Sequence, residues 1–258
     1  MENPEILLTN DDGVDAAGLH ALQAALSSVG SVTVVSPVTD QSAVGRTRSQ
    51  SVAVHEHDRG YAVDGTPVDC VVAGVQSLLP EVDLVVAGCN QGANLGSAVL
   101  GRSGTVSAAV EAAFLDVPAM AVSMYIPESL FDGGAHLDQA AYTAAVDSTA
   151  YLVEYADDSL FGAADYLNIN APITERSTGE MSVTRPSGVY RMTADRDGQT
   201  IQIRDTIWDE MASGTTTDPP GTDRHAVLEN RISVSPLSAP HTTENGTGLG
   251  ALADAYPT

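Results

Sequence analysis

The opening part of the chain combines apolar runs with amphipathic stretches. Ile6-Leu7-Leu8 is an uninterrupted apolar run, which is typical of a strand buried on both faces. Across residues 16–29 apolar residues recur at three- and four-residue spacing, which predicts a helix with one buried face. Gly30 ends that helix, and residues 32–36 form the next predicted strand. This order predicts the first half of a Rossmann-like α/β fold, a doubly wound and mainly parallel sheet.

The middle of the chain continues the alternation of strands and helices. Thr66, Pro67 and Asp69 have the residue types of an N-cap, a first helical position and a first turn. We therefore expect a helix from Pro67 to about Leu79, which Pro80 ends. The other expected elements are a hairpin over 51–55 and 61–63, strands at 83–88, 117–122 and 166–170, a small-residue helix ending near 115 and a long helix at 137–155.

The last third of the chain has a different pattern. Residues 182–185 and 200–206 alternate at period two, and Asp195-Arg196-Asp197-Gly198 between them has the composition of a hairpin turn. This predicts a β-hairpin arm over about 181–207 that projects from a single α/β domain formed by residues 1–258. Residues 209–224 are expected to be a loop, 232–237 a strand, and 240–258 a mobile polar tail.

The charge balance changes the view of the surface. The 258 residues contain 34 acidic and 11 basic side chains, all of the latter arginine, for a formal net charge of −23. Such a field opposes nucleic-acid backbones and anionic lipid, so we expect no polymeric nucleic acid and no membrane as partner. An acidic disordered protein is excluded because 43% of the residues are hydrophobic and periodically placed. The balance indicates a halophilic protein, since molar salt screens self-repulsion to within about 3 Å.

The segments that direct proteins out of the cytoplasm are not evident in the sequence. The first residues lack a basic region followed by an apolar one, and no apolar run approaches the length of a membrane span. We therefore expect a cytoplasmic protein. Cys70 and Cys89 belong to no metal-binding pattern and lie among apolar residues, so they are expected to be buried free thiols.

Candidate chemistry appears where the first predicted strand ends. Asp11 and Asp12 follow the apolar run directly, and Gly13 begins a turn. Open α/β sheets bind ligands at this edge, and two adjacent carboxylates need a cation or a proton between them. A hard divalent cation such as Mg²⁺ or Mn²⁺ is the simplest partner for such oxygen ligands. The alternative is an ordinary Asp-Asp-Gly turn that faces solvent.

Two further loops carry polar groups to the same edge of the sheet. The loop over 37–45 follows a predicted strand and contains small hydroxyl residues, although an ordinary surface loop also fits it. The loop over 88–96 combines asparagine with glycine, which offers oxygens to a cation and allows close backbone approach. Ser103-Gly104-Thr105 opens a helix, where free N–H groups and hydroxyls form an anion site.

A set of short motifs occurs in order from about Ile6 to Leu237. They are Leu8-Thr9-Asn10-Asp11-Asp12-Gly13, Gln41-Ser42, Gly65-Thr66-Pro67-Val68-Asp69-Cys70-Val71, residues 83–96, Ser103-Gly104-Thr105-Val106-Ser107-Ala108-Ala109, Leu167-Asn168-Ile169-Asn170-Ala171-Pro172, Val183-Thr184-Arg185, Gly221-Thr222-Asp223 and Ser233-Val234-Ser235-Pro236-Leu237. Any one of them is weakly specific, but this many in sequence resembles the SurE survival-protein family of metal-dependent 5′/3′-nucleotidases.

The resemblance implies a site and an activity. It implies one divalent ion per subunit (Mg²⁺, Mn²⁺ or Co²⁺) held by Asp11, Asp12, Ser42 and Asn90. Asp11 and Asp12 are the candidate catalytic residues, with Asp11 orienting or deprotonating the attacking water; the alternative is that both aspartates are only metal ligands. The positions that match the phosphate-facing residues are Asn94, Ser103, Gly104 and Thr105. The substrate would be a nucleoside 5′- or 3′-monophosphate. The family also forms homodimers or homotetramers through a C-terminal β arm. This sequence departs from the family at Arg102, where tyrosine is frequent, and a guanidinium there is expected to affect phosphate binding.

The residues bear on two rival functions. Haloacid-dehalogenase-type phosphatases use an Asp-x-Asp-Gly motif with the first aspartate as nucleophile, and alignment on Gly13 places Asn10 at that position. An amide cannot form an aspartyl-phosphate, so that mechanism is excluded. A non-catalytic nucleotide or phosphate sensor on the same fold remains the alternative, because a fold alone does not determine function.

Overall fold

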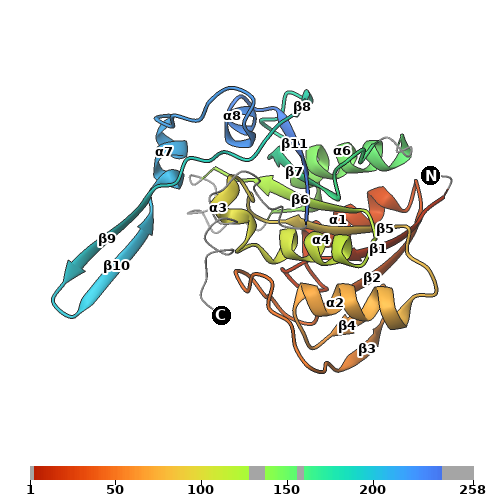
Figure 1. Ribbon diagram of the computed structural model, residues 1–258. Coiled ribbons are helices and arrows are strands. Elements are labelled where there is room, and N and C mark those ends of the chain that lie inside the picture. Colours follow the sequence, from red (N-terminus) through yellow and green to blue (C-terminus); the bar gives the residue numbers. More distant parts are fainter. Residues whose placement is uncertain (1–2, 128–136, 156–159, 240–258) are drawn as a thin grey trace, which may run out of the picture.

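A computed structural model describes residues 3–127, 137–155 and 160–239 of the chain. A nine-stranded sheet forms its body, in the order β3-β4-β2-β1-β5-β6-β7-β11-β8, and a separate two-stranded ribbon joins β9 to β10 (Figure 1). The strands are β1 (Glu5–Thr9), β2 (Ser31–Pro37), β3 (Val54–His57), β4 (Gly60–Val63), β5 (Leu84–Asn90), β6 (Ala119–Tyr125), β7 (Tyr166–Pro172), β8 (Met181–Val183), β9 (Met192–Asp197), β10 (Thr200–Asp205) and β11 (Ile232–Leu237).

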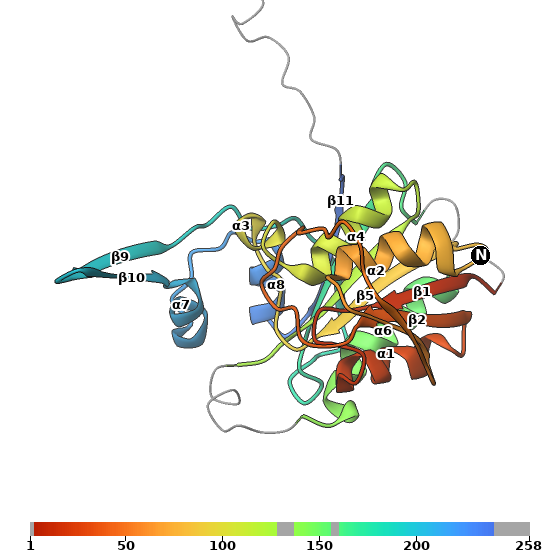
Figure 2. The ribbon, with the colours of Figure 1, turned by 90° about the horizontal axis from the view of Figure 1, so that it is seen from below.

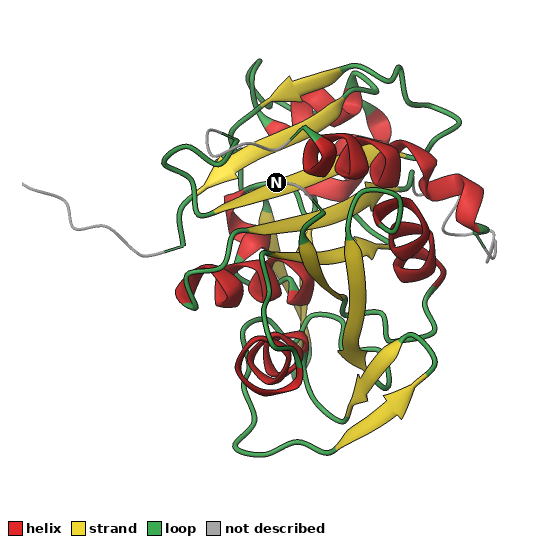
Figure 3. Ribbon diagram, turned by 90° about the vertical axis from the view of Figure 1, so that its right-hand side faces the viewer, coloured by secondary structure: helices red, strands yellow, loops and turns green. Residues whose placement is uncertain are grey.

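Helices cover both faces of this sheet (Figure 3). The α-helices are α1 (Ala17–Leu26), α2 (Pro67–Ala73), α3 (Ser97–Leu100), α4 (Gly104–Phe114), α6 (Thr143–Glu154), α7 (Ile207–Ser213) and α8 (Asp223–Leu228). A π-helical turn, η1 (Gly74–Leu78), extends α2, and a 3₁₀ turn, η2 (Gln139–Tyr142), precedes α6. The long helix expected over 137–155 is therefore divided between η2 and α6.

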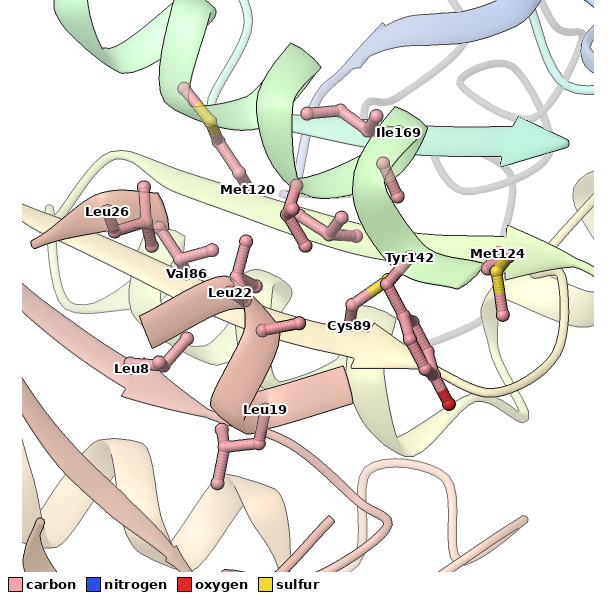
Figure 4. Close-up of a cluster of buried hydrophobic side chains, with 14 of the residues drawn as sticks. Leu8, Leu19, Leu22, Leu26, Val86, Cys89, Met120, Met124, Tyr142 and Ile169 are labelled. Atoms are coloured by element: carbon pink, nitrogen blue, oxygen red, sulfur yellow. The ribbon is translucent and has the colours of Figure 1, made fainter. Parts of the chain in front are cut away.

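Side chains of β1 alternate between two clusters of buried apolar residues. Ile6 and Leu8 belong to a cluster that includes residues of α1 and α6, and Leu7 belongs to the cluster of α2 and α4. Figure 4 shows the first cluster, in which Leu19, Leu22 and Leu26 of α1 lie over the sheet. Because both faces are covered, β1 has no polar face, as its uninterrupted apolar run predicted.

The central strands run in one direction. β1 pairs in parallel with β2 and β5, and β6 pairs in parallel with β5 and β7. The carboxyl ends of these strands therefore meet at one edge of the sheet, where α/β proteins bind ligands. β11 runs antiparallel to β7 and adds a mixed edge. The expected Rossmann-like α/β fold is confirmed. A hairpin is present where one was expected, but its first strand covers Val54–His57 in place of 51–55.

The predicted start of α2 is also confirmed. Thr66 is the N-cap, its hydroxyl accepts from the Asp69 amide at 3.2 Å, and the Asp69 carboxylate accepts from the Thr66 amide at 2.9 Å. This capping box satisfies two N–H groups that a helix end otherwise leaves unpaired. Cys70 and Cys89 are buried free thiols, as expected.

The C-terminal third differs from the prediction in two places. The hairpin consists of β9 and β10, with Thr200 opposite Asp197, so residues assigned to the turn form its first strand. The stretch at 182–185 does not belong to the hairpin, because β8 pairs with β11 in the main sheet. The ribbon of β9 and β10 extends away from the body in both views (Figures 1 and 2).

The second difference concerns residues 209–224. This stretch was expected to be a loop, but it contains most of α7 and the start of α8. Its Gly, Pro, Thr and Asp content obscured both helices, which are seven and six residues long. The tail expected over 240–258 lies outside the described residues. Among the residues that are described, no helix has the length and apolar character needed to cross a membrane.

Candidate active site

Polar residues from several elements gather at the carboxyl edge of the sheet. Asp11 and Asp12 follow β1, and Asn90 is the last residue of β5. Ser42 lies in the loop after β2, and Thr105 lies in the first turn of α4. The parallel pairing of β1 with β5 and β2 brings these segments together, as the strand-end positions predicted.

Asn10 braces the turn that presents the aspartate pair. Its Nδ2 donates to the Gly13 carbonyl at 2.9 Å, and its Oδ1 accepts from the Gly13 amide at 3.2 Å and from the Ser36 hydroxyl. Gly13 has φ of +99°, a region that side chains rarely adopt. Asn10 is fully buried and its amide is committed to this turn, which agrees with its exclusion as a nucleophile.

Asp11 lies against the N-terminus of α4. The Thr105 hydroxyl donates to Asp11 Oδ1 at 2.5 Å, and the Asp11 carbonyl accepts from the Gln41 amide at 2.7 Å. A Cβ on Gly104 would lie 2.8 Å from Asp11 Oδ2, so only glycine allows this approach. Burial raises the pKa of Asp11 and outweighs the opposing effect of the Thr105 hydrogen bond.

Asp12 is half-buried beside it. Its Oδ2 accepts from the Gln91 amide at 3.2 Å. Burial first, and then the charges of Asp11 and Asp40, raise the pKa of Asp12 from 3.8 to about 6. Two neighbouring carboxylates, one buried and one half-buried, that resist ionising together are suited to a cation that offsets their charge.

Asp40 was missed as a member of this site. It raises the pKa of both aspartates through its charge, and its Oδ1 accepts from the amide and the hydroxyl of Ser42 at 2.7 and 2.6 Å. The sequence feature that could have identified Asp40 is its position in the polar loop after β2, two residues before Ser42. Ser42 is exposed, and its hydroxyl is directed to Asp40 in this structure.

Asn90 offers an oxygen at the same edge. Its Nδ2 donates to the Gly92 carbonyl at 2.6 Å, which leaves Oδ1 as the atom suited to a cation. Across the described ranges, no group of three or more His, Cys, Asp or Glu side chains could hold a metal ion. An ion here would therefore depend on two carboxylates and neutral oxygens, the mixed set that Mg²⁺ uses together with substrate phosphate.

The start of α4 forms the expected helix N-terminus. Ser103 is the N-cap, and its hydroxyl accepts from the Val106 amide at 3.1 Å. Gly104 and Thr105 follow as the first helical residues, and all three are buried. The Ser103 N–H donates to the Val99 carbonyl at 3.2 Å, so the N–H groups of Gly104 and Thr105, together with the helix dipole, favour an anion at this point.

Asn94 lies in a buried polar network that sequence reasoning did not find. Its side-chain Nδ2 donates to the Ser123 hydroxyl at 2.9 Å, and its backbone N–H donates to Asn170 Oδ1 at 2.8 Å. The Asn94 carbonyl in turn accepts from the side-chain amides of Asn168 and Asn170. The asparagines of β7 thus hold the loop after β5. The sequence feature that could have revealed this network is the pair of asparagines on one face of the apolar strand β7.

A second buried network joins the loop after β5 to the base of the arm. Asp223 accepts from the amides of Gly96 and Ser187 at 2.7 and 2.9 Å. Arg224 is buried beside it, donates to the Val189 carbonyl at 2.9 Å and lies 3.3 Å from Asp218. One carboxylate therefore holds both the loop after β5 and the segment that leads into β9.

Arg102, which departs from the expected residue type, faces the same segment. Its guanidinium donates to the Tyr190 hydroxyl at 3.0 Å and lies 5.9 Å from the centre of that ring. In this structure its charge is therefore directed to the base of the arm.

Comparison with known proteins identifies the family. A sequence model described as Survival protein SurE matches residues 6–192. The chain belongs to the SurE family. The 5′-nucleotidase SurE of Haloarcula marismortui is 57% identical over 259 residues, which cover 99% of this chain and 96% of the relative. The 5′-nucleotidase SurE of Halobacterium salinarum is also 57% identical and covers 99% of both chains.

A solved SurE structure supports the fold. The crystal structure of the SurE protein from Aquifex aeolicus has a TM-score of 0.74 and 31% sequence identity, and the match covers 93% of this chain and 95% of that one. SurE proteins depend in general on a divalent metal ion, as the resemblance implied. The halophilic relatives also agree with the acidic, lysine-free composition.

Proposed function

We propose that this chain is a metal-dependent phosphomonoesterase that removes phosphate from nucleoside 5′- or 3′-monophosphates. The observation that carries the proposal is the contact of the buried Asp11 with Thr105, which joins the carboxylate pair to a helix N-terminus. One half of that arrangement suits a cation and the other half suits a phosphate. The high identity to proteins named 5′-nucleotidase SurE supports the same activity.

The residues fit one divalent ion per subunit. Asp11 and Asp12 would supply carboxylate oxygens, and Ser42 and Asn90 would supply neutral ones. These hard oxygen donors suit Mg²⁺, Mn²⁺ or Co²⁺, and the raised pKa of both aspartates is consistent with a pair that needs an opposing charge. When bound, the ion offsets phosphoryl charge and lowers the pKa of a bound water.

The chain's own residues have separate tasks in this proposal. Asp11 orients the attacking water or takes its proton, and Asp12 acts with it as the second catalytic carboxylate. The N–H groups of Gly104 and Thr105, at the N-terminus of α4 that Ser103 caps, bind phosphoryl oxygens as charge develops in the transition state; the Ser103 N–H already donates to the Val99 carbonyl at 3.2 Å. For Asn94, the proposed phosphate contact competes with the hydrogen bond between its Nδ2 and Ser123.

We also propose that the β9–β10 hairpin joins subunits into a homodimer or homotetramer. Ile201 and Ile203 on β10 are 58% and 69% exposed, on a ribbon that extends from the body. Exposed apolar side chains on a projecting element favour burial against another chain. Cytoplasmic location stays a prediction of the sequence.

The test is release of inorganic phosphate from adenosine 5′-monophosphate. We expect release with Mg²⁺, Mn²⁺ or Co²⁺ in concentrated KCl, and its loss in EDTA. Asp11→Asn and Asp12→Asn should each abolish turnover, whereas Asp58→Asn in the exposed turn between β3 and β4 should not. Near-normal activity of either site variant would refute the proposed site. Nucleotide binding without phosphate release would favour the non-catalytic sensor.

A further inference from the structure

A cavity of about 770 Å³ opens directly beside the aspartate pair. Its lining includes Asp12 and Asp40, His20 of α1 and Tyr142 of η2. Its volume lies within the range of roughly 300–1,000 Å³ that small-molecule sites occupy. A substrate whose phosphate lies near Asp12 therefore has room for a larger group in this cavity.

Gln91 connects the cavity to Asp12. Its backbone amide donates to Asp12 Oδ2, and its side-chain Oε1 accepts from the Tyr142 hydroxyl at 3.2 Å. Because Oε1 is committed to Tyr142, the amide Nε2 is the atom that Gln91 offers to a ligand. Tyr142 thus fixes which end of this side chain faces the cavity.

Tyr142 itself is held firmly. Its ring is 1% exposed and lies against Gly18, where a Cβ would come within 2.9 Å of Tyr142 Cε1. Figure 4 shows the ring beside Cys89, with the hydroxyl directed away from the apolar cluster. Burial raises the pKa of Tyr142, so the hydroxyl keeps its proton and acts as the donor to Gln91.

The other polar groups of the cavity are mainly acceptors. His20 Nε2 lies 3.1 Å from the Val14 carbonyl, which can only accept, so Nε2 is the donor in that bond and is not offered to a ligand. Asp15 and Asp138 add carboxylates to the wall. Carboxylate oxygens accept hydrogen bonds, so these side chains are suited to hydroxyl and amino donors of a ligand.

We propose that this cavity binds the nucleoside part of the substrate, with Gln91 as the contact residue and Tyr142 as the residue that positions it. Ribose hydroxyls and base amino groups supply the donors that an acceptor-rich wall requires. The acidic wall also disfavours a second phosphate at this place. The assignment rests on the nucleotidase activity proposed above and adds the side of the site that recognises the nucleoside.

The test compares two substrates and one conservative variant. Tyr142→Phe removes only the hydroxyl, and Tyr151→Phe on the exposed side of α6 is its matched control. For Tyr142→Phe we expect KM for adenosine 5′-monophosphate to rise about 3- to 10-fold, the effect of one hydrogen bond, with kcat within about twofold. The kcat/KM for p-nitrophenyl phosphate, which has no nucleoside, should stay unchanged for both variants.

An equal loss on both substrates would overturn the proposal, because Tyr142 would then only support Asp12. No change on either substrate would overturn it as well. Calorimetric binding of adenosine separates this idea from the nucleotidase activity. If the wild-type protein releases no phosphate from either substrate but binds adenosine, and Tyr142→Phe weakens that binding, the cavity assignment stands and the nucleotidase proposal fails. Absence of adenosine binding together with unaltered KM contradicts the cavity assignment.

Discussion

The Thr105 hydroxyl donates to Asp11 Oδ1 at 2.5 Å, across 94 positions of sequence. Thr105 is fully buried and Asp11 is 4% exposed, so this bond forms where water contributes little. It connects a carboxylate from the loop after β1 to the first turn of α4. This hydroxyl therefore helps to fix the geometry of the proposed metal and phosphate subsites relative to each other.

Replacement of that hydroxyl should reduce activity. Thr105→Val keeps the side-chain shape but leaves Asp11 Oδ1 without its donor. A hydrogen bond to a charged group contributes about 1.5–3 kcal/mol, so we expect kcat/KM for adenosine 5′-monophosphate to fall about 10- to 100-fold. Thr105→Ser keeps the hydroxyl and should stay within a few-fold of wild type. Equal activity of the valine and serine variants would contradict this role.

Gly104 provides a steric test of the same contact. In Gly104→Ala the new Cβ would lie 2.8 Å from both Cβ and Oδ2 of Asp11, so the carboxylate must move. Alanine favours the helix by up to about 1 kcal/mol over glycine, so the fold should be kept while kcat/KM falls by at least about 10-fold. Gly101→Ala is the control, since a Cβ there meets nothing within 4 Å. Similar activity of the two variants would show that Asp11 does not need its observed position.

The aspartate pair should destabilise the metal-free protein at neutral pH. The folded-state pKa of Asp12, about 6, lies above the ordinary value of 3.8, so the folded state binds its proton more tightly. The stability from this group is complete below about pH 4 and is lost as pH rises through about 6. In EDTA, Asp12→Asn should raise the melting temperature at pH 7.5 and leave it nearly unchanged at pH 4. A lower melting temperature at pH 7.5 would be the opposite result, and Asp58→Asn serves as the surface control.

The buried pair of Arg224 and Asp218 should matter more than an exposed pair. Its two side chains are 2% and 1% exposed, and Arg224→Met leaves Asp218 and Asp223 buried without their cation. Loss of one partner of a buried pair typically costs about 3–5 kcal/mol of unfolding free energy. Arg231→Met removes a partly exposed pair with Glu229 and should cost about 0–1 kcal/mol. Urea unfolding in concentrated KCl measures both, and equal losses would contradict the prediction.

The net charge of −23 predicts a requirement for salt. The Debye length is about 3 Å at 1 M ionic strength and about 10 Å at 0.1 M, so dilution extends the repulsion between surface carboxylates. We expect the melting temperature and the phosphatase activity to fall as KCl decreases from about 3 M to about 0.1 M. An uncharged osmolyte at equal osmolality should restore less stability than KCl. A protein equally stable and active in low salt would contradict the halophilic interpretation.

The elements that could be predicted were those with strong local signals. The start of α2 could be predicted from the capping residues Thr66, Pro67 and Asp69. The strands β1 and β5 could be predicted from apolar runs, which are typical of strands buried on both faces. β9 gave no such signal, because five of its six residues are exposed and its charged residues have the composition of a turn. α8 was missed because its buried Arg224 and Asp223 look like loop residues until their partners are known.

The site was predictable to the extent that its residues lie at strand ends. Asp11, Asp12 and Asn90 follow parallel strands, and Ser103 to Thr105 begin a helix, so topology alone brings them to one edge. The contact of Tyr142 with Gln91 spans 51 positions and depends on how η2 packs over α1. No local pattern encodes it. The role of Asp40 was hidden for a similar reason, since its influence on Asp12 is electrostatic and acts through space.

Asp223 has a consequence for how this protein can be divided. The family match ends at residue 192, whereas the carboxylate that holds the Gly96 amide lies beyond that point. A fragment that stops where the match stops would leave Gly96 and Ser187 without their shared acceptor. The described segment after residue 192 is therefore an integral support of the loop after β5, and the match does not mark a self-contained module followed by a removable appendage.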